Sequence, residues 1–277
     1  MDPKNSQGNA PSAAFKTKID QAIALEREAH RFRGENKIDQ AFQTFDQAAK
    51  LFQEANEPLK AAVCFSSAAT CWNIHTGWQP LRNAATRNES AALQAIAAKD
   101  YAYAETLFSE ASLLYEKEGD FTKYSYCYRR AKDARLVRLW KTFMPSQERG
   151  SPAVGLSSVS WKERVLTFTS WFFGLLNRLI WGYGEMPLCT FGIACGVIAI
   201  SAFCYYFSGA VLTGGFVQKI GLFESFYFSI MTYTTVGYGD YIPTEWVRGV
   251  AAIEALLGIL LTPLFLISLS RRYLRTR

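Results

Sequence analysis

The sequence predicts a mainly α-helical protein in two parts, a helical solenoid over residues 14–144 and a membrane-embedded domain over 187–277. Three observations predict this class. Small and aromatic residues recur at helical spacing through the first part, and long apolar segments fill the second. A segment rich in glycine, proline and serine, 145–160, separates the two as a linker.

Composition narrows the possible functions. Hydrophobic residues make up 49% and charged residues 19%, which excludes a disordered chain. The net charge of +6 is dispersed and therefore gives no reason to expect a nucleic-acid partner. We find no phosphate-binding glycine loop, nucleophile motif or metal-ligand cluster in the sequence, so we do not expect an enzyme or an organic cofactor.

The first part begins with a polar segment, residues 1–13, that we expect to be a disordered tail. Beyond it, a small–aromatic–small pattern recurs at positions i, i+4 and i+7, which share one face of a helix. The pattern occurs at Ala41–Phe45–Ala48, Ala61–Phe65–Ala68, Ala104–Phe108–Ala111 and, more weakly, Tyr124–Tyr128–Ala131. Glycine, asparagine and proline between these stretches predict six helices, near 16–33, 37–55, 58–75, 81–98, 100–118 and 121–141.

The run KIDQAFQTFDQAAKLFQEANEPLKAAVCFSSAA within this part resembles the repeats of the soluble NSF attachment proteins, a tetratricopeptide-like family. The resemblance covers roughly residues 37–136. It implies a cytoplasmic helical domain that could dock a protein partner through residues 14–144. A generic helical bundle built from the same small and aromatic residues is the alternative.

After the linker, residues 161–186 are expected to form an amphipathic helix at the membrane surface, followed by a turn. Trp161, Val165 and Phe168 begin an apolar face at helical spacing. A third membrane span is the rival interpretation. That span would place the first part outside the cell and bury Arg178 in lipid.

Two segments of the second part are long enough to cross a bilayer, 187–208 and 246–270. Between them, 221–233 is apolar and aromatic but too short to cross. A short apolar segment between two spans predicts a re-entrant helix, which is tolerated where protein or water surrounds it.

The sequence that follows the short helix is Thr-Thr-Val-Gly-Tyr-Gly-Asp, at residues 234–240. Span, short helix, TVGYGD and second span together resemble the two-transmembrane prokaryotic potassium channels with a KcsA-type pore. The resemblance covers about residues 187–270. It implies that the chain conducts K⁺ passively as a homotetramer embedded in membrane lipids, because one chain supplies one filter strand.

The resemblance also assigns roles within the filter. It implies that the carbonyl groups of Thr235, Val236, Gly237 and Tyr238 bind K⁺, and that the Thr235 hydroxyl adds the innermost ring. Gly237 and Gly239 allow the backbone angles that aim carbonyls at one axis. The side chains of Val236 and Tyr238 then point outward and pack as a sleeve.

Several positions around the filter depart from the family. Met231 stands where many members have a glutamate, and Tyr227 where they have a tryptophan. We therefore expect Asp240 to bond Tyr227 or the backbone. Glu254 is an intramembrane acid that we expect to hydrogen-bond the short helix rather than line the pore.

Two residues of the second span are candidates for a gating hinge. Gly258 aligns with the family's hinge glycine, but close helix packing explains a glycine there equally well. Pro263 should bend the same helix.

The charge pattern predicts how the chain is oriented in the membrane. Arg178, Arg271 and Arg272 flank the spans, so both termini should be cytoplasmic in a plasma or bacterial inner membrane. We expect a potassium-selective channel whose helical domain regulates gating, or instead assists assembly or docks a partner. The alternatives are a membrane-anchored helical-repeat interaction scaffold and a weakly selective cation channel.

Overall fold

The computed structural model describes residues 13–74, 79–144, 161–213 and 216–275. The chain divides into two compact units between Phe172 and Phe173. The expected tail, up to residue 12, and the expected linker, 145–160, lie outside the described residues. Helices dominate both units, so the predicted mainly α-helical class is confirmed.

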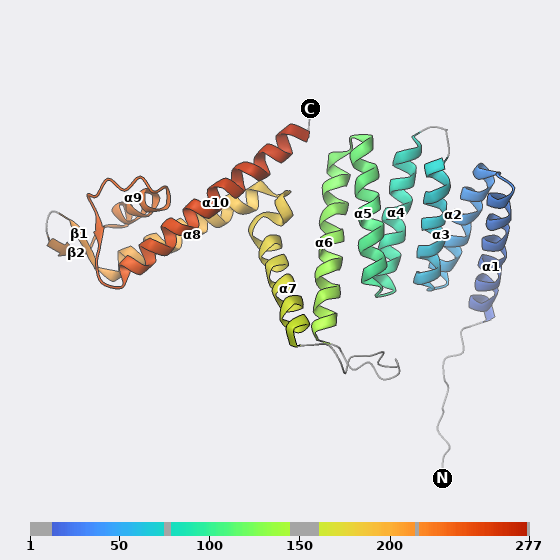
Figure 1. The fold of residues 1–277 in the computed structure, drawn as a ribbon, viewed down its shortest axis with the longest axis horizontal. Coiled ribbons are helices and arrows are strands. Elements are labelled where there is room, and N and C mark those ends of the chain that lie inside the picture. The colour runs from blue at the N-terminus through green and yellow to red at the C-terminus, as the bar shows by residue number, and fades with distance from the viewer. Residues whose placement is uncertain (1–12, 75–78, 145–160, 214–215, 276–277) are drawn as a thin grey trace, which may run out of the picture. The chain divides into compact units, whose positions relative to one another are not determined.

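The first unit contains a row of six helices. Consecutive helices pack against each other along the row, as Figure 1 shows. This nearest-neighbour packing is the arrangement of a solenoid. The helices are α1 (Ala13–Gly34), α2 (Ile38–Glu54), α3 (Pro58–Ile74), α4 (Pro80–Ala97), α5 (Tyr101–Glu118) and α6 (Phe121–Phe143), close to the predicted ranges.

Alanine and phenylalanine build the core of this unit. All nine residues of the three strong small–aromatic–small triplets are buried. Phe108 is completely inaccessible and packs among alanines of neighbouring helices. Alanine lets helix backbones approach closely, and the aromatic ring fills the space beside them.

Short turns connect α1 to α2, α2 to α3, α4 to α5 and α5 to α6, and each of these four turns has one residue with left-handed backbone. Asn36, Asn56, Lys99 and Gly119 have φ of 59°, 49°, 60° and 82°. Asparagine and glycine adopt this region most easily, which explains why these residue types mark the predicted breaks.

Polar contacts also join helices that are not neighbours in the row. Arg87 of α4 forms an ion pair of 2.5 Å with Asp46 of α2. Glu89 of α4 accepts a hydrogen bond of 2.8 Å from the Tyr115 hydroxyl of α5. Glu89 also forms an ion pair of 3.2 Å with Lys123 of α6. Helices α2, α4 and α6 are therefore tied together along one side of the row.

Helix α7 (Trp161–Trp181) matches the range expected for the amphipathic helix. Within the first unit, its aromatic side chains contact the last helix of the row. The rings of Trp171 and Trp140 lie 4.7 Å apart, and those of Phe168 and Phe143 lie 5.4 Å apart. Among the described residues, only α8 and α10 are long and apolar enough to cross a membrane, which counts against α7 as a third span.

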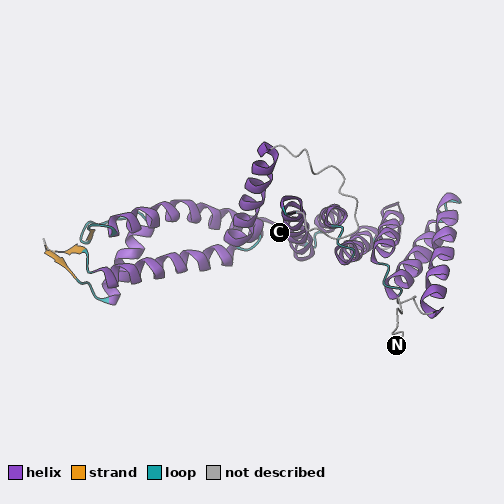
Figure 2. Ribbon diagram, turned by 90° about the horizontal axis from the view of Figure 1, so that it is seen from below, coloured by secondary structure: helices purple, strands orange, loops and turns teal. Residues whose placement is uncertain are grey.

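The second unit is built on two long helices, α8 (Pro187–Ser208) and α10 (Val247–Arg275), which pack against each other. Figure 2 shows this pair side by side, with the strands at one end. The short helix α9 (Leu222–Tyr233) packs on both. A turn of 3₁₀ helix, η2 (Gly182–Gly184), precedes α8 and contacts α10.

The bounds of α8 match the first predicted span, and those of α9 match the short helix within one residue. Helix α10 begins one residue after the start of the second predicted span, 246–270, and extends beyond its end. Helix α10 continues to Arg275, because Arg271 and Arg272 favour helix and their charge suits its C-terminal end.

A small antiparallel sheet, which the sequence analysis did not predict, joins the loops beside α9. The order is β2 (Phe216–Gln218), β1 (Val211–Thr213) and β3 (Ile242–Pro243). The Thr244 backbone N–H and hydroxyl both donate to the Ala210 carbonyl, at 2.9 and 2.7 Å. The loop after residue 240 is thereby fixed to the end of α8.

Candidate functional site

Residues 234–240 form an exposed segment between α9 and β3. Its backbone alternates in handedness: Thr235, Gly237 and Gly239 have φ of 59°, 52° and 80°, whereas Val236 and Tyr238 do not have positive φ. In an extended strand, successive carbonyls point to opposite sides. Reversing the handedness at every second residue turns those peptide groups over, so that the carbonyls can face one side.

The left-handed backbone of Thr235 is a feature that the sequence analysis missed. A β-branched residue resists this region, at a cost of roughly 1–2 kcal/mol. Two hydrogen bonds hold Thr235 there: its N–H donates to the Thr232 carbonyl at 3.0 Å, and its hydroxyl donates to the Thr234 carbonyl at 2.7 Å.

Met231 supports the same segment through its main chain. Its carbonyl accepts hydrogen bonds from the N–H groups of Val236, at 3.0 Å, and Gly237, at 3.3 Å. The last turn of α9 therefore continues directly into the segment. Every residue type has a main-chain carbonyl, so the sequence could not predict this contact. It showed only that position 231 lacks the glutamate found in many potassium channels.

Asp240 lies where both expected partners are within reach. Its carboxylate is hydrogen-bonded to the Tyr227 side chain of α9. It also accepts from the Tyr241 backbone N–H at 3.2 Å. The rings of Tyr227 and Tyr241 lie 5.9 Å apart, so an aromatic pair flanks the carboxylate.

Glu254 is almost fully buried behind α9, where all three helices of the unit meet. Its carboxyl oxygens are hydrogen-bonded to the hydroxyls of Tyr205 on α8, at 2.5 Å, and Ser229 on α9. Ser201 of α8 is hydrogen-bonded to the same carboxyl. The expected hydrogen bond to the short helix is therefore present, joined by two contacts to the first span.

Gly258 and Pro263 occupy different surroundings. A Cβ at Gly258 would overlap the backbone carbonyl oxygen of Tyr233, so this glycine lets α10 pack directly on the end of α9. Pro263 lies inside α10, which remains helical on both sides of it.

In a single chain the apolar side chains of the segment are uncovered. Val236 is 52% exposed and Tyr238 is 72% exposed. The packed sleeve expected for them is therefore absent from one chain alone, and further protein would have to supply it.

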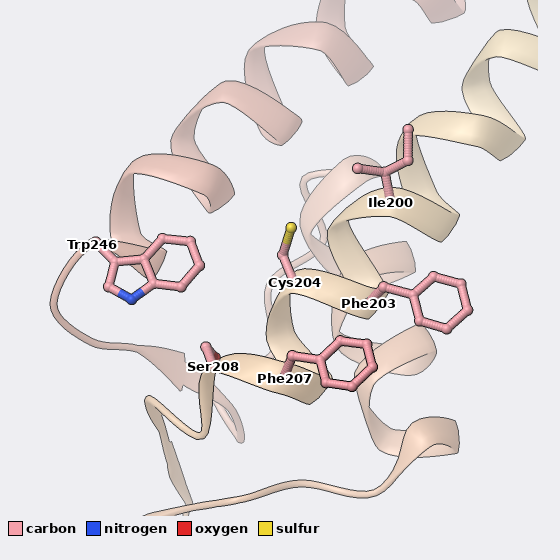
Figure 3. Close-up of a pocket in the computed structure, with 6 residues that line it drawn as sticks. All are labelled: Ile200, Phe203, Cys204, Phe207, Ser208 and Trp246. Carbon is pink, nitrogen blue, oxygen red and sulfur yellow. The ribbon is translucent and has the colours of Figure 1, made fainter.

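An apolar pocket lies apart from this segment, between α8 and the start of α10 (Figure 3). Its lining consists of Ile200, Phe203, Cys204, Phe207, Ser208 and Trp246. Figure 3 shows the Trp246 indole on one side and side chains of α8 on the other. Because this lining lacks charged groups, the pocket does not suit a cation.

Comparison with known proteins bears on the same region. Residues 188–275 match the family model described as ion channel. Over 49 residues the chain is 53% identical to two-pore potassium channel 2 of Arabidopsis thaliana. That alignment covers 18% of this chain and 10% of the plant protein.

The matched residues, 188–275, make up about a third of the chain. No solved structure matches the chain. The matched region holds α8, α9, α10 and the segment 234–240, and its two apolar helices indicate a membrane protein. The helical row of the first unit lies outside the matched region.

Proposed function

We propose that the chain is a subunit of a potassium-selective channel and that residues 234–240 are its filter. The alternating backbone handedness at Thr235, Gly237 and Gly239 carries this proposal. K⁺ loses water on entering a pore, and rings of carbonyl oxygens replace that water. The carbonyls of Thr235, Val236, Gly237 and Tyr238 supply those oxygens, with the Thr235 hydroxyl below them.

Four identical chains surround the pore. One segment of backbone offers oxygens on one side of an ion only, so a complete shell needs several copies around an axis. The exposed Val236 and Tyr238 support assembly, because each leaves an apolar surface that another part of the assembly would cover. The name of the plant relative, a potassium channel, agrees with K⁺ as the permeant ion.

The C-terminal end of α10, which carries Arg271, Arg272 and Arg275, faces the cytoplasm together with the start of α8. A Cβ at Gly184, just before α8, would lie 3.1 Å from the guanidinium of Arg271 near the end of α10. Cytoplasmic loops are rich in Lys and Arg, so both chain termini lie on that side. The opposite end, with the strands and residues 234–240, faces outward.

The helical row regulates opening through α7. The ring contacts of Trp140 with Trp171 and of Phe143 with Phe168 join α6 to α7 without using residues 145–160. A displacement of α6 can therefore reach the helix that leads into the first span. Assembly or docking of a protein partner by this tetratricopeptide-like row is the rival role.

Trp171→Ala tests the regulatory role. It should alter open probability while leaving selectivity unchanged, because it removes the contact with α6. Leu166→Ala, at an exposed position of the same helix, is the matched control. Unchanged open probability in both variants would favour the assembly or docking role.

A flux assay tests the channel itself. Purified protein in liposomes should pass K⁺, and Gly237→Ala should abolish this flux. No atom lies within 4 Å of a Cβ at Gly237, so the loss would come from the positive φ that alanine resists. K⁺ flux equal to the parent's in Gly237→Ala would refute the assigned filter.

A further inference from the structure

One stripe of α10 holds the short helix at three successive turns. Glu254 is hydrogen-bonded to Ser229, Gly258 packs on the Tyr233 carbonyl, and Thr262 is hydrogen-bonded to the Tyr233 side chain. Positions four apart share one face of a helix. These residues of α10 therefore contact α9 as far as Tyr233, the residue that precedes the segment 234–240.

Glu254 is the polar centre of this contact. Within the described part of the chain, its hydrogen-bonding partners are the hydroxyl groups of Ser201, Tyr205 and Ser229. Tyr205 is the titratable group among them, and none carries a positive charge. An ionised carboxylate buried without a cation is strongly disfavoured.

The Ser229 hydroxyl links Glu254 of α10 to the main chain of α8. The Ser229 hydroxyl has one hydrogen but two oxygen partners, Glu254 Oε1 and the Ile198 carbonyl at 2.9 Å. A carbonyl only accepts, so Ser229 donates to Ile198. If Glu254 were ionised, the single Ser229 hydrogen would be shared between both acceptors; a hydrogen on Glu254 Oε1 makes each contact a full hydrogen bond.

We propose that Glu254 is an uncharged carboxylic acid that positions α9 between the two long helices. Its Oε1–H donates to Ser229, which donates to the Ile198 carbonyl, while Oε2 accepts from Tyr205. These bonds join α8, α9 and α10 behind the residues that lead into the filter. The consequence for conduction rests on the proposed function, whereas the protonation does not.

Infrared spectroscopy of the purified full-length protein in D₂O tests the protonation. At neutral pH the parent should show the carbonyl stretch of a protonated carboxylic acid, and Glu254→Gln should lack it. Glu245→Gln, at an exposed glutamate before α10, is the matched control and should keep the band. A spectrum in which Glu254→Gln loses only carboxylate absorption would overturn the proposal.

A second pair of variants tests the hydrogen-bond chain. Ser229→Ala removes the acceptor of the Glu254 proton and should move the band to higher frequency. Ser225 lies one turn earlier on α9, is equally buried, and donates its hydroxyl to the Gly221 carbonyl at 2.8 Å, away from Glu254. Ser225→Ala should therefore leave the band in place. A band whose frequency is unchanged in Ser229→Ala would contradict a hydrogen bond donated by Glu254 to Ser229.

Potassium flux then tests the positioning role. Glu254→Gln can donate to Ser229 and accept from Tyr205, so it should retain the parent's flux. Glu254→Leu can do neither and should lose most of it. Flux retained by the leucine variant, or lost by the glutamine variant, would refute positioning by neutral hydrogen bonds. Absence of flux in the parent, with the band present, would refute the channel proposal alone.

Discussion

Replacing Gly258 by alanine should separate α10 from the end of α9. The added Cβ would overlap the Tyr233 carbonyl oxygen, which is backbone and cannot rotate away. The Cβ would lie 1.9 Å from that oxygen, whereas an ordinary C···O contact needs about 3.3 Å, so the two helices must move apart by about 1.4 Å. Overpacking of this kind costs about 1–3 kcal/mol per chain.

In the proposed tetramer this strain recurs in each chain, for a total of about 4–12 kcal/mol if the four sites act independently. The assay is the temperature at which the proposed tetramer dissociates in detergent, measured together with K⁺ flux. Both should fall in Gly258→Ala. Gly249→Ala is the matched control on the same helix, because nothing lies within 4 Å of a Cβ at Gly249.

The competing role for Gly258 is that of a gating hinge. A hinge glycine replaced by alanine would change open probability without weakening assembly. If Gly258→Ala dissociates at the parent's temperature while its open probability changes, the close-packing account is wrong.

Two further predictions concern the helical row. Phe108→Ala should destabilise this unit by about 3–5 kcal/mol in denaturant unfolding, because the ring is completely buried, whereas exposed Leu113→Ala should change stability by about 0.5 kcal/mol or less; similar losses in both would contradict the assigned core. Burial raises the pKa of Cys64 and of Cys127 to about 12, so the reactive thiolate is scarce below that pH. Neither of these two thiols should react with maleimide at pH 8 until urea unfolds the protein, whereas the exposed Cys189 and Cys195 can react in the folded chain. Labelling of Cys64 or Cys127 in the folded chain would show that these helices open.

Most helices could be predicted because their signals are local. The small–aromatic–small triplets repeat at helical spacing, and their burial follows from that spacing alone. The first span could be delimited because Pro187 favours the first turn of a helix and Gly209 ends it with φ of 61°.

Features that depend on distant contacts could not be predicted. Strands of two or three residues have no periodicity, and β1 pairs with residues about thirty positions further along the chain. The hydrogen-bonding partners of Glu254 lie on two other helices. An acid within an apolar stretch of sequence therefore indicated a functional residue but could not identify Ser229 or Tyr205 as its partners. The left-handed backbone of Thr235 opposes the preference of its residue type, and main-chain hydrogen bonds impose it.

The reversal potential across a bilayer, with K⁺ on one side and Na⁺ on the other, tests the central claim most directly. The unbroken motif from Thr235 to Gly239 and its alternating backbone predict a potential far from zero, in the direction of K⁺ preference. A reversal potential near zero, with measurable current, would show a weakly selective cation pore and contradict a carbonyl-lined potassium filter.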